Sequence, residues 1–279
     1  MSGAVGHKRV SKEFIETHPI PLPPLAEQKR IVAILDEAFE GIDTAIANAK
    51  KNLANARELF ETYLGSVFSL EAEWVKKTVG ELADHSLGKM LDKQKNRGTL
   101  EPYLRNLNVR WFGFDLDDVL QMPFEDDEAD RYTAIKGDVL MCEGGYPGRC
   151  AIWDSDERIY IQKAIHRIRF KQKNLNRWFL YFVHFLNMQD RLREHFTGSG
   201  IQHFTGQALH RFHVSLPPPD DLENYVVRFD AHRDLSQELE TVYRQKLGHL
   251  KGLKQAILQK AFTGELTERS VEAVQEAAR

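Results

Sequence analysis

The chain has 279 residues, of which 42% are hydrophobic and 28% are charged, and this is enough for one sizeable core plus extended elements. No run reaches the roughly 18 apolar residues that a membrane span needs, the N-terminus lacks the apolar stretch of a secretory signal, and only two cysteines occur, so we expect a protein of the reducing cytoplasm. A net charge of −3 argues against a protein that coats DNA without sequence preference, because neutralising phosphates requires an excess of Lys and Arg.

The first predicted element is a long helix that follows a proline-rich segment. Residues 19–24 read P-I-P-L-P-P, where proline fixes the backbone and removes hydrogen-bond donors, so an extended segment should end there. Apolar residues then recur in steps of three or four, which predicts a helix about 54 Å long whose narrow apolar stripe must be buried against another helix. The stripe comprises Ile31, Leu35, Ala38, Ile42, Ile46, Ala49, Leu53, Ala56, Phe60, Tyr63 and Val67.

The middle of the chain has the shorter period that is typical of β-strands. Strands are predicted at residues 74–82, 103–109, 138–142, 151–153, 158–161 and 164–170. A Gly-rich turn at residues 144–148 separates two of them. Residues 177–196 instead carry the pattern of a mostly buried helix.

A second long helix is predicted from about residue 222 to residue 261, with Gly264 as its stop. Sliding the chain by 194 residues aligns its two ends from Gly6 to Phe68 without a gap. The identities are few, but an L-P-P hinge and then a long helix occur in both places, which indicates an internal repeat and helices of equivalent role. The predicted fold class is α+β: one globular domain with a mixed β-sheet, plus two long helices that form an antiparallel coiled coil.

Six segments carry a resemblance to one protein family. Those toward the ends are P-I-P-L-P-P-L-A-E-Q-K-R-I-V (residues 19–32), L-P-P-P (216–219) and L-K-Q-A-I-L-Q-K-A-F-T-G-E-L-T (253–267). Those in the middle are W-x-x-x-x-V-G-E-L (74–82), Y-L-R-N-L-N-V (103–109) and K-G-D-V-L (136–140). Together they resemble the specificity subunits of type I restriction-modification systems. In that family two target recognition domains alternate with two helical conserved regions, and each domain reads one half of a split DNA target.

The resemblance implies a domain organisation. Residues 1–18 would be the remnant of a recognition-domain end, 19–70 the first conserved helical region, 71–217 the target recognition domain, 218–266 the second conserved helical region, and 267–279 a tail. Because a complete subunit of this family carries another recognition domain before residue 19, we expect a half-type or truncated subunit that associates as a homodimer.

The resemblance also implies partners. The helices should dock methyltransferase subunits, which bring S-adenosylmethionine, and through that complex a restriction subunit. The chain itself would then need no cofactor, and its remaining partner would be double-stranded DNA.

Motifs for catalysis or metal binding do not appear in the sequence. It lacks the Asn/Asp-Pro-Pro-aromatic motif of DNA methyltransferases, and the Gly-rich turn lacks the lysine of a P-loop. The spacing of Cys142, Cys150, His210 and His213 matches no zinc pattern. We therefore expect no catalytic residue and no metal, and a binding protein rather than an enzyme.

Sequence-specific DNA binding requires planar donors for base edges and cations for phosphates, and loops of the middle region offer both, beginning with what we expect to be a flexible basic stretch. The residues predicted to contact DNA are Lys89, Lys93, Lys95, Arg97, Arg105, Asn106, Tyr146, Arg149, Gln162, Lys163, Ser199, Gln202 and His203. The residues predicted at the interface with a partner helix are Ile31, Leu35, Ile42, Ile46, Leu53, Phe60, Leu239, Leu247, Leu250 and Ile257.

Three functions remain open at this point. The leading hypothesis is a subunit that selects a DNA sequence for a methyltransferase. The alternatives are a non-catalytic scaffold that binds methyltransferase subunits without productive specificity, and a free-standing enzyme.

Overall fold

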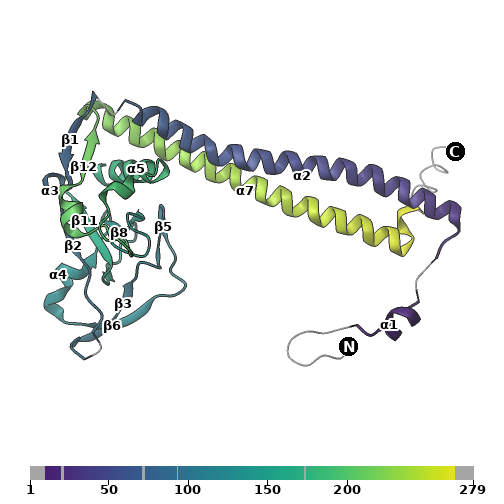
Figure 1. The fold of residues 1–279 in the computed structure, drawn as a ribbon, viewed down its shortest axis with the longest axis horizontal. Coiled ribbons are helices and arrows are strands. Elements are labelled where there is room, and N and C mark those ends of the chain that lie inside the picture. Colours follow the sequence, from purple (N-terminus) through teal and green to yellow (C-terminus); the bar gives the residue numbers. More distant parts are fainter. Residues whose placement is uncertain (1–9, 20–21, 71–72, 93, 173, 268–279) are drawn as a thin grey trace. The chain divides into compact units, whose positions relative to one another are not determined.

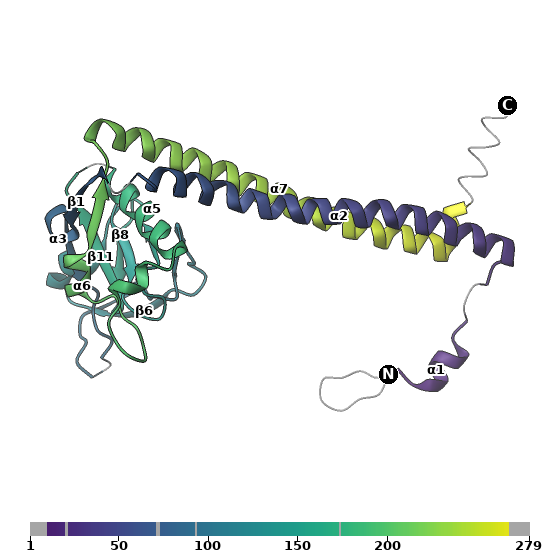
Figure 2. The same cartoon turned by 45° about the horizontal axis from the view of Figure 1, so that its top comes forward.

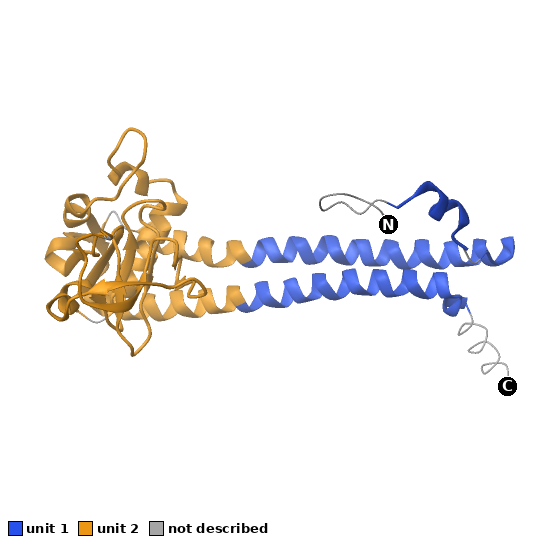
Figure 3. Ribbon diagram, turned by 90° about the horizontal axis from the view of Figure 1, so that it is seen from below, with its two compact units in different colours: residues 1–56, 238–279 blue, residues 57–237 orange. Residues whose placement is uncertain are grey.

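The computed structural model describes residues 10–19, 22–70, 73–92, 94–172 and 174–267. The chain divides into two compact units (Figure 3): a helical unit of residues 1–56 and 238–279, and a globular unit of residues 57–237. Two long helices, α2 (Leu25–Phe68) and α7 (Pro219–Thr263), each contribute to both units. In the part of the chain that the structure describes, no helix has the length and apolarity needed to cross a membrane.

In the helical unit, α2 and α7 lie side by side and run antiparallel (Figures 1 and 2). Ile42 and Ala49 of α2 are buried. Lys254 on α7 donates to both carboxylate oxygens of Asp43 on α2 at 2.8 and 2.9 Å, and its ammonium lies 4.7 Å from the centre of the Phe39 ring. The predicted antiparallel coiled coil is therefore confirmed.

The side chains predicted at the helix interface are shielded from solvent. Two of them are buried, Ile42 and Phe60, but among the described residues the ring contacts of Phe60 are with Phe112, Tyr181 and His184 of the globular unit and not with the partner helix. The others are half-buried: Ile31, Leu35, Ile46, Leu53, Leu239, Leu247, Leu250 and Ile257. Lys50 and Lys51, which fall between the apolar positions of α2, are exposed. The α2 surface is thus apolar and shielded along one narrow stripe and exposed beside it, as in a coiled coil.

Toward both ends of the chain, a capped six-residue helix precedes a long helix, although among the described residues strand β12 (His213–Leu216) lies between the two helices only in the second case. Helices α1 (Lys12–Thr17) and α6 (Gly206–Arg211) have six residues each. Ser11 and Thr205, which are 194 positions apart, cap these helices by accepting a hydrogen bond from the backbone N–H three residues later. The first residues of α2 and α7, Leu25 and Pro219, are separated by the same 194 positions. The repeat inferred from sequence is thus also present in the backbone.

The described residues of the globular unit form two four-stranded sheets and two short ribbons. The first sheet has the order β6 (Leu120–Phe124), β3 (Thr99–Leu104), β10 (Ile159–Ile161), β7 (Thr133–Ala134). The second has the order β2 (Ala83–Leu87), β11 (Ile165–Phe170), β8 (Val139–Cys142), β9 (Cys150–Ile152). The ribbons pair β1 (Val75–Thr78) with β12 (His213–Leu216) and β4 (Val109–Arg110) with β5 (Gly113–Phe114). The remaining helices are α3 (Val79–Leu82), α4 (Ala129–Tyr132) and α5 (Leu175–Met188), with 3₁₀ turns at Asp126–Glu128 and Leu192–His195.

The α+β class with a mixed sheet is confirmed, because β3 and β10 run parallel while their other neighbours are antiparallel. The second sheet is antiparallel throughout, so the single predicted sheet is in fact two. All four residues of β8 are buried. Because both faces of this strand are covered, its residues do not alternate between apolar and polar, and its pairing partners cannot be read from its own sequence.

Two predicted elements have different bounds in the structure. The segment predicted as a strand at residues 74–82 is a strand only to Thr78, because Thr78 and Glu81 form a capping box that starts α3. The helix predicted at residues 177–196 ends at Met188 and is followed by a separate 3₁₀ turn. Asp190 adopts a φ of 57° between them, which an α-helix does not allow.

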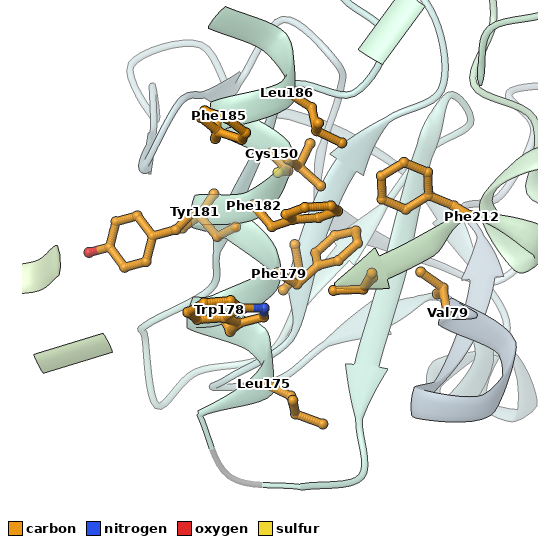
Figure 4. Packing of buried hydrophobic residues seen from close by; sticks show 14 of the residues in the cluster. Val79, Cys150, Leu175, Trp178, Phe179, Tyr181, Phe182, Phe185, Leu186 and Phe212 are labelled. Atoms are coloured by element: carbon orange, nitrogen blue, oxygen red, sulfur yellow. The ribbon is translucent and has the colours of Figure 1, made fainter. Parts of the chain in front are cut away.

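The main core of the globular unit forms around α5, from which Phe179 and Phe182 point toward the second sheet (Figure 4). Trp178 also donates from Nε1 to the Ser215 carbonyl at 2.8 Å. On the other side of α5, Tyr181 donates to Asp230 of α7, and burial raises the pKa of this tyrosine. The last turns of α2 and the first turns of α7 are therefore part of the globular core.

Replacing Phe68 with Ala should lower the free energy of unfolding by about 3–5 kcal/mol, the usual cost of deleting a buried aromatic ring. Phe68 is 1% exposed and its ring centre lies 4.9 Å from Phe185, 5.0 Å from Trp178 and 5.6 Å from Phe229. Urea unfolding measures the change. Leu59→Ala, at an exposed position of the same helix, is the matched control, and equal losses in the two variants would contradict this account of the core.

Candidate nucleic-acid interface

Four loops of the globular unit meet at one surface, which we call the recognition face: residues 104–108, 143–149, 162–164 and 196–204. Backbone hydrogen bonds join them directly. Gln162 N donates to the Leu104 carbonyl at 3.0 Å, Glu143 N to Ala164 at 2.9 Å, and Phe204 N to Glu143 at 2.7 Å. Residues separated by up to about 100 positions in sequence are thus fixed against one another.

Two glycines allow these loops to approach so closely. The Asn106 amide nitrogen donates to the Gly144 carbonyl at 3.0 Å. A Cβ on Gly145, whose φ is 77°, would lie 2.4 Å from that nitrogen, and a Cβ on Gly144 would lie 2.8 Å from Nδ1 of His203. The positive φ favours glycine at position 145, and a side chain at position 144 would require the His203 ring to move.

Arg149 is held in a defined orientation on this face. It donates to the Asn106 carbonyl at 3.0 Å, and its guanidinium carbon lies 3.7 Å from the centre of the Tyr146 ring. Stacking on an aromatic ring limits the rotamers of the planar guanidinium without neutralising its charge. Tyr146 is 52% exposed, so this stacked pair lies at the surface.

The loop of residues 196–204 is a hairpin with a fixed base. Thr197 and His203 exchange backbone hydrogen bonds of 2.8 and 2.9 Å. Between them, Ser199 and Gln202 are exposed. Nε2 of the buried His166 on β11 lies 2.8 Å from the Phe204 carbonyl, so the hairpin base is tied to the second sheet. Burial lowers the pKa of His166 to about 4, and this imidazole is neutral at pH 7.

The structure brings eight of the predicted DNA-contacting residues to the recognition face. They are Asn106, Tyr146, Arg149, Gln162, Lys163, Ser199, Gln202 and His203. Lys163 is exposed and Gln162 is half-buried. Lys95 and Arg97 are exposed in the segment between β2 and β3, outside these four loops, and Lys93 lies outside the described residues.

The structure corrects the expectation that Lys89 belongs to a flexible basic stretch. Its side chain is only 9% exposed and forms an ion pair with Glu128. Its ammonium also donates to the Pro123 carbonyl at 3.0 Å and lies 5.0 Å from the centre of the Phe124 ring. Burial works against ionisation of Glu128, but the hydrogen bond and charge of Lys89, together with the Glu125 backbone N–H and the charge of Arg131, lower the pKa of that carboxyl. A buried cation needs such a partner, so this lysine is committed to the fold.

Arg105, also predicted to contact DNA, is likewise paired within the fold. Its guanidinium donates to the Asp118 carboxylate at 2.5 Å and to the Asp118 carbonyl at 2.9 Å. The side chain is 19% exposed. The acidic loop after β5 therefore takes up this charge, while the neighbouring Asn106 points to the Gly-rich loop.

The structure also reveals exposed apolar side chains that the sequence reading passed over. Leu107 follows Asn106 and is 51% exposed, and Ile201 at the hairpin tip is 76% exposed. The sequence indicates this exposure at one of the two positions: Ile201 is a lone apolar residue in the otherwise polar run T-G-S-G-I-Q-H.

Among the described residues, no three His, Cys, Asp or Glu side chains are placed to share a metal ion. Of the four residues considered from the sequence, Cys142 and Cys150 are buried on neighbouring strands. Burial raises the pKa of Cys142 to about 11 and also raises that of Cys150, which disfavours the thiolate that a metal requires. His210 lies 3.2 Å from another ring nitrogen, that of His85.

Comparison with known proteins gives a match to the family described as type I restriction modification DNA specificity domain, over residues 1–55 and 71–247. The chain is 25% identical over 270 residues to the EcoKI specificity subunit of Escherichia coli K12, covering 89% of this chain and 58% of that protein. It is 24% identical over 295 residues to the EcoBI specificity subunit of Escherichia coli, covering 95% and 62%. The chain thus spans about three fifths of the length of these relatives.

Two solved structures share the fold. A chain of a type I R-M system, solved in work on complex assembly and conformational transition, aligns with a TM-score of 0.74 at 23% identity, covering 92% of this chain and 64% of that one. The HsdS subunit from Thermoanaerobacter tengcongensis aligns with a TM-score of 0.61 at 23% identity, covering 95% and 65%.

Lowering the pH from 7 to 5 should destabilise the globular unit through His166. The pKa of this side chain is about 4 in the fold, against an ordinary value of 6.5, so between these values the unfolded chain binds more protons and stability falls as the pH falls. At pH 5 the loss from this group should be about 2 kcal/mol. Urea unfolding at both pH values measures it.

His166→Gln should keep the hydrogen bond to the Phe204 carbonyl but remove the titratable imidazole. Any change in the free energy of unfolding caused by the substitution itself is measured at pH 7. The variant should therefore lose less stability than the parent between pH 7 and pH 5. An identical loss in both proteins would show that His166 is not the group responsible.

Proposed function

Because the chain belongs to the family of type I restriction modification DNA specificity domains, we propose that it is the sequence-specific DNA recognition subunit of a type I restriction-modification complex. It selects the target for methyltransferase subunits, which supply the chemistry, and for a restriction subunit that joins through the complex. The role is one of binding, with no reaction on the chain itself. The observation that carries this proposal is the gathering of polar and cationic side chains from four distant loops at the recognition face.

The recognition face has the groups that base reading requires. An arginine oriented by an aromatic ring suits the O6 and N7 acceptors of guanine, and the amides of Gln162 and Gln202 suit adenine. Lys163 is exposed and provides a cation for a phosphate, which positions the duplex but does not identify its sequence. The rigid backbone around Gly144 and Gly145 keeps these groups in register with one another.

The long helices are proposed to hold the other subunits. In the helical unit, the exposed surfaces of α2 and α7 surround a narrow buried stripe and remain available for methyltransferase subunits. In this proposal the target recognition domain comprises residues 71–217, between conserved helical regions at 19–70 and 218–266, with a domain remnant at 1–18 and a tail at 267–279.

We further propose that two copies associate as a homodimer. The repeated order of capped short helix, hinge and long helix at the two ends of the chain supports equivalent roles for α2 and α7. A two-fold pair would present two recognition domains, which suits a split palindromic target. Light scattering at micromolar concentration tests this, and a strict monomer would rule it out.

Exchange of residues 71–216 for the corresponding domain of a related subunit should change the sequence that is methylated while leaving the complex assembled. The exchange is tested by co-expression with the methyltransferase subunits and sequencing of the methylated plasmid. A complex that assembles with either domain but methylates no defined sequence would instead support the alternative of a scaffold without productive specificity.

Arg149→Ala should weaken specific binding by about 1–3 kcal/mol, or roughly 5- to 150-fold, and relax the preference at one position of the target. Arg149→Lys keeps the charge but loses the planar fork, so it should relax the same position while retaining non-specific affinity. Fluorescence anisotropy with specific and scrambled duplexes separates these effects.

The matched control is Arg158→Ala, an exposed arginine at the end of β10 away from Gln162. It should leave both affinities close to those of the parent. An equal loss in the Arg149 and Arg158 variants would remove the recognition face from the proposal.

A further inference from the structure

We infer that Ile201 is a specificity-determining residue that reads a thymine, through contact with its 5-methyl group in the major groove of DNA. This inference rests on the proposed function and adds to it an apolar contact that the polar groups of the recognition face do not provide.

Ile201 is displayed at the tip of a hairpin whose base cannot move freely. The base is fixed by the paired backbones of Thr197 and His203, by the bond from Phe204 N to Glu143, and by His166 beneath it. Phe196 and Phe204 pack together at a ring distance of 5.7 Å on the protein side of this base. Gly198, at a φ of 107°, has no room for a side chain, because a Cβ would lie 2.4 Å from the Ile201 carbonyl. The tip is therefore a compact, tightly turned structure.

The fold itself gives no reason for an isoleucine at this position. Its side chain is 76% exposed, more than any other large apolar side chain that the structure describes in the globular unit. The neighbouring residues Ser199, Gly200 and Gln202 are also exposed. Burial of an aliphatic side chain of this size lowers the free energy. In the free protein this side chain stays in water, so a partner surface that covers it would gain that free energy.

The chemistry of the tip fits the major groove. The thymine methyl is the apolar group that base edges present there, and the groove is about 12 Å wide, enough for a two-stranded ribbon. Residues 196–206 include no Asp or Glu, so the hairpin can enter between phosphates without like-charge repulsion. Ser199 and Gln202, on either side of the tip, supply hydrogen-bonding groups for the adjacent base pairs.

The test uses the full chain together with its methyltransferase subunits, and a library of randomised DNA duplexes. Selection with the parent protein should yield a motif that contains at least one fixed thymine. Selection with Ile201→Ala should lose the preference at that thymine alone, whereas Leu116→Ala, at an exposed apolar position outside the recognition face and the long helices, should select the parental motif. Thermal unfolding should be the same in the three proteins, because neither side chain is buried.

Replacement of the identified thymine by deoxyuridine then removes only the methyl group. The parent should lose about fourfold in affinity, as expected for one buried methyl group, and Ile201→Ala should show no further loss on the deoxyuridine duplex. Independent, multiplying losses would overturn the inference. So would an unchanged motif for Ile201→Ala, or a loss that is uniform over all sequences, which is the result expected of an apolar wedge between base steps.

The proposed function can fail separately from this inference. If the parent complex enriches no motif, both are wrong. If it enriches a motif that Ile201→Ala leaves intact, the chain still reads DNA but Ile201 does not take part.

Discussion

The packing of Phe68 and Phe229 against α5 is the contact on which the rest of the globular unit depends. These two rings come from the end of α2 and the start of α7, and they stack at a centre distance of 5.6 Å within the aromatic cluster around Trp178. The core of this unit is consequently built from helix ends as well as from its own sheets. A change in these helix turns would be transmitted to α5 and to the second sheet, whose strand β11 carries His166 beneath the recognition hairpin.

At the recognition face the dominant constraint is the close approach of side chains to the backbone of the Gly-rich turn. The Asn106 amide donates to the Gly144 carbonyl, and Cβ atoms on Gly145 and Gly144 would lie 2.4 Å from the Asn106 amide nitrogen and 2.8 Å from Nδ1 of His203. A surface held in this way keeps the spacing between its donors when the polar side chains around it are exchanged. Under the proposed function, such a support would hold base-reading side chains at fixed positions.

The sequence was most informative where periodicity was long and uniform. The apolar stripe of α2 and the end of α7 at Gly264 are both as predicted, because a helix with one buried face has apolar residues at regular intervals. The chain from residue 74 to 82 was harder, since the capping box of Thr78 and Glu81 is a local signal that interrupts an apparently continuous strand pattern. The division of the β-strands into two sheets has no local signal at all, because it depends on which strands pair across the fold.

The candidate site was partly predictable for a related reason. Residue type identifies side chains able to contact DNA, and eight of those chosen reach the recognition face, where their function remains a prediction. Type alone does not tell whether a cation is already paired. Lys89 and Arg105 read as free basic groups in the sequence, yet Glu128 and Asp118, 39 and 13 positions later, neutralise them. Residue type also misleads at Ile201. An aliphatic residue is ordinarily assigned to a core, but in the folded chain this side chain is 76% exposed.

The ribbon of β1 and β12 has an evolutionary meaning. It pairs Val75 with Leu216 and Thr78 with His213, so the chain enters and leaves the domain at adjacent points. Everything between these strands can change in length or identity while the two flanking helices keep their spacing. Under the proposed function, recombination between related genes at these junctions would create a chain of new specificity in one step.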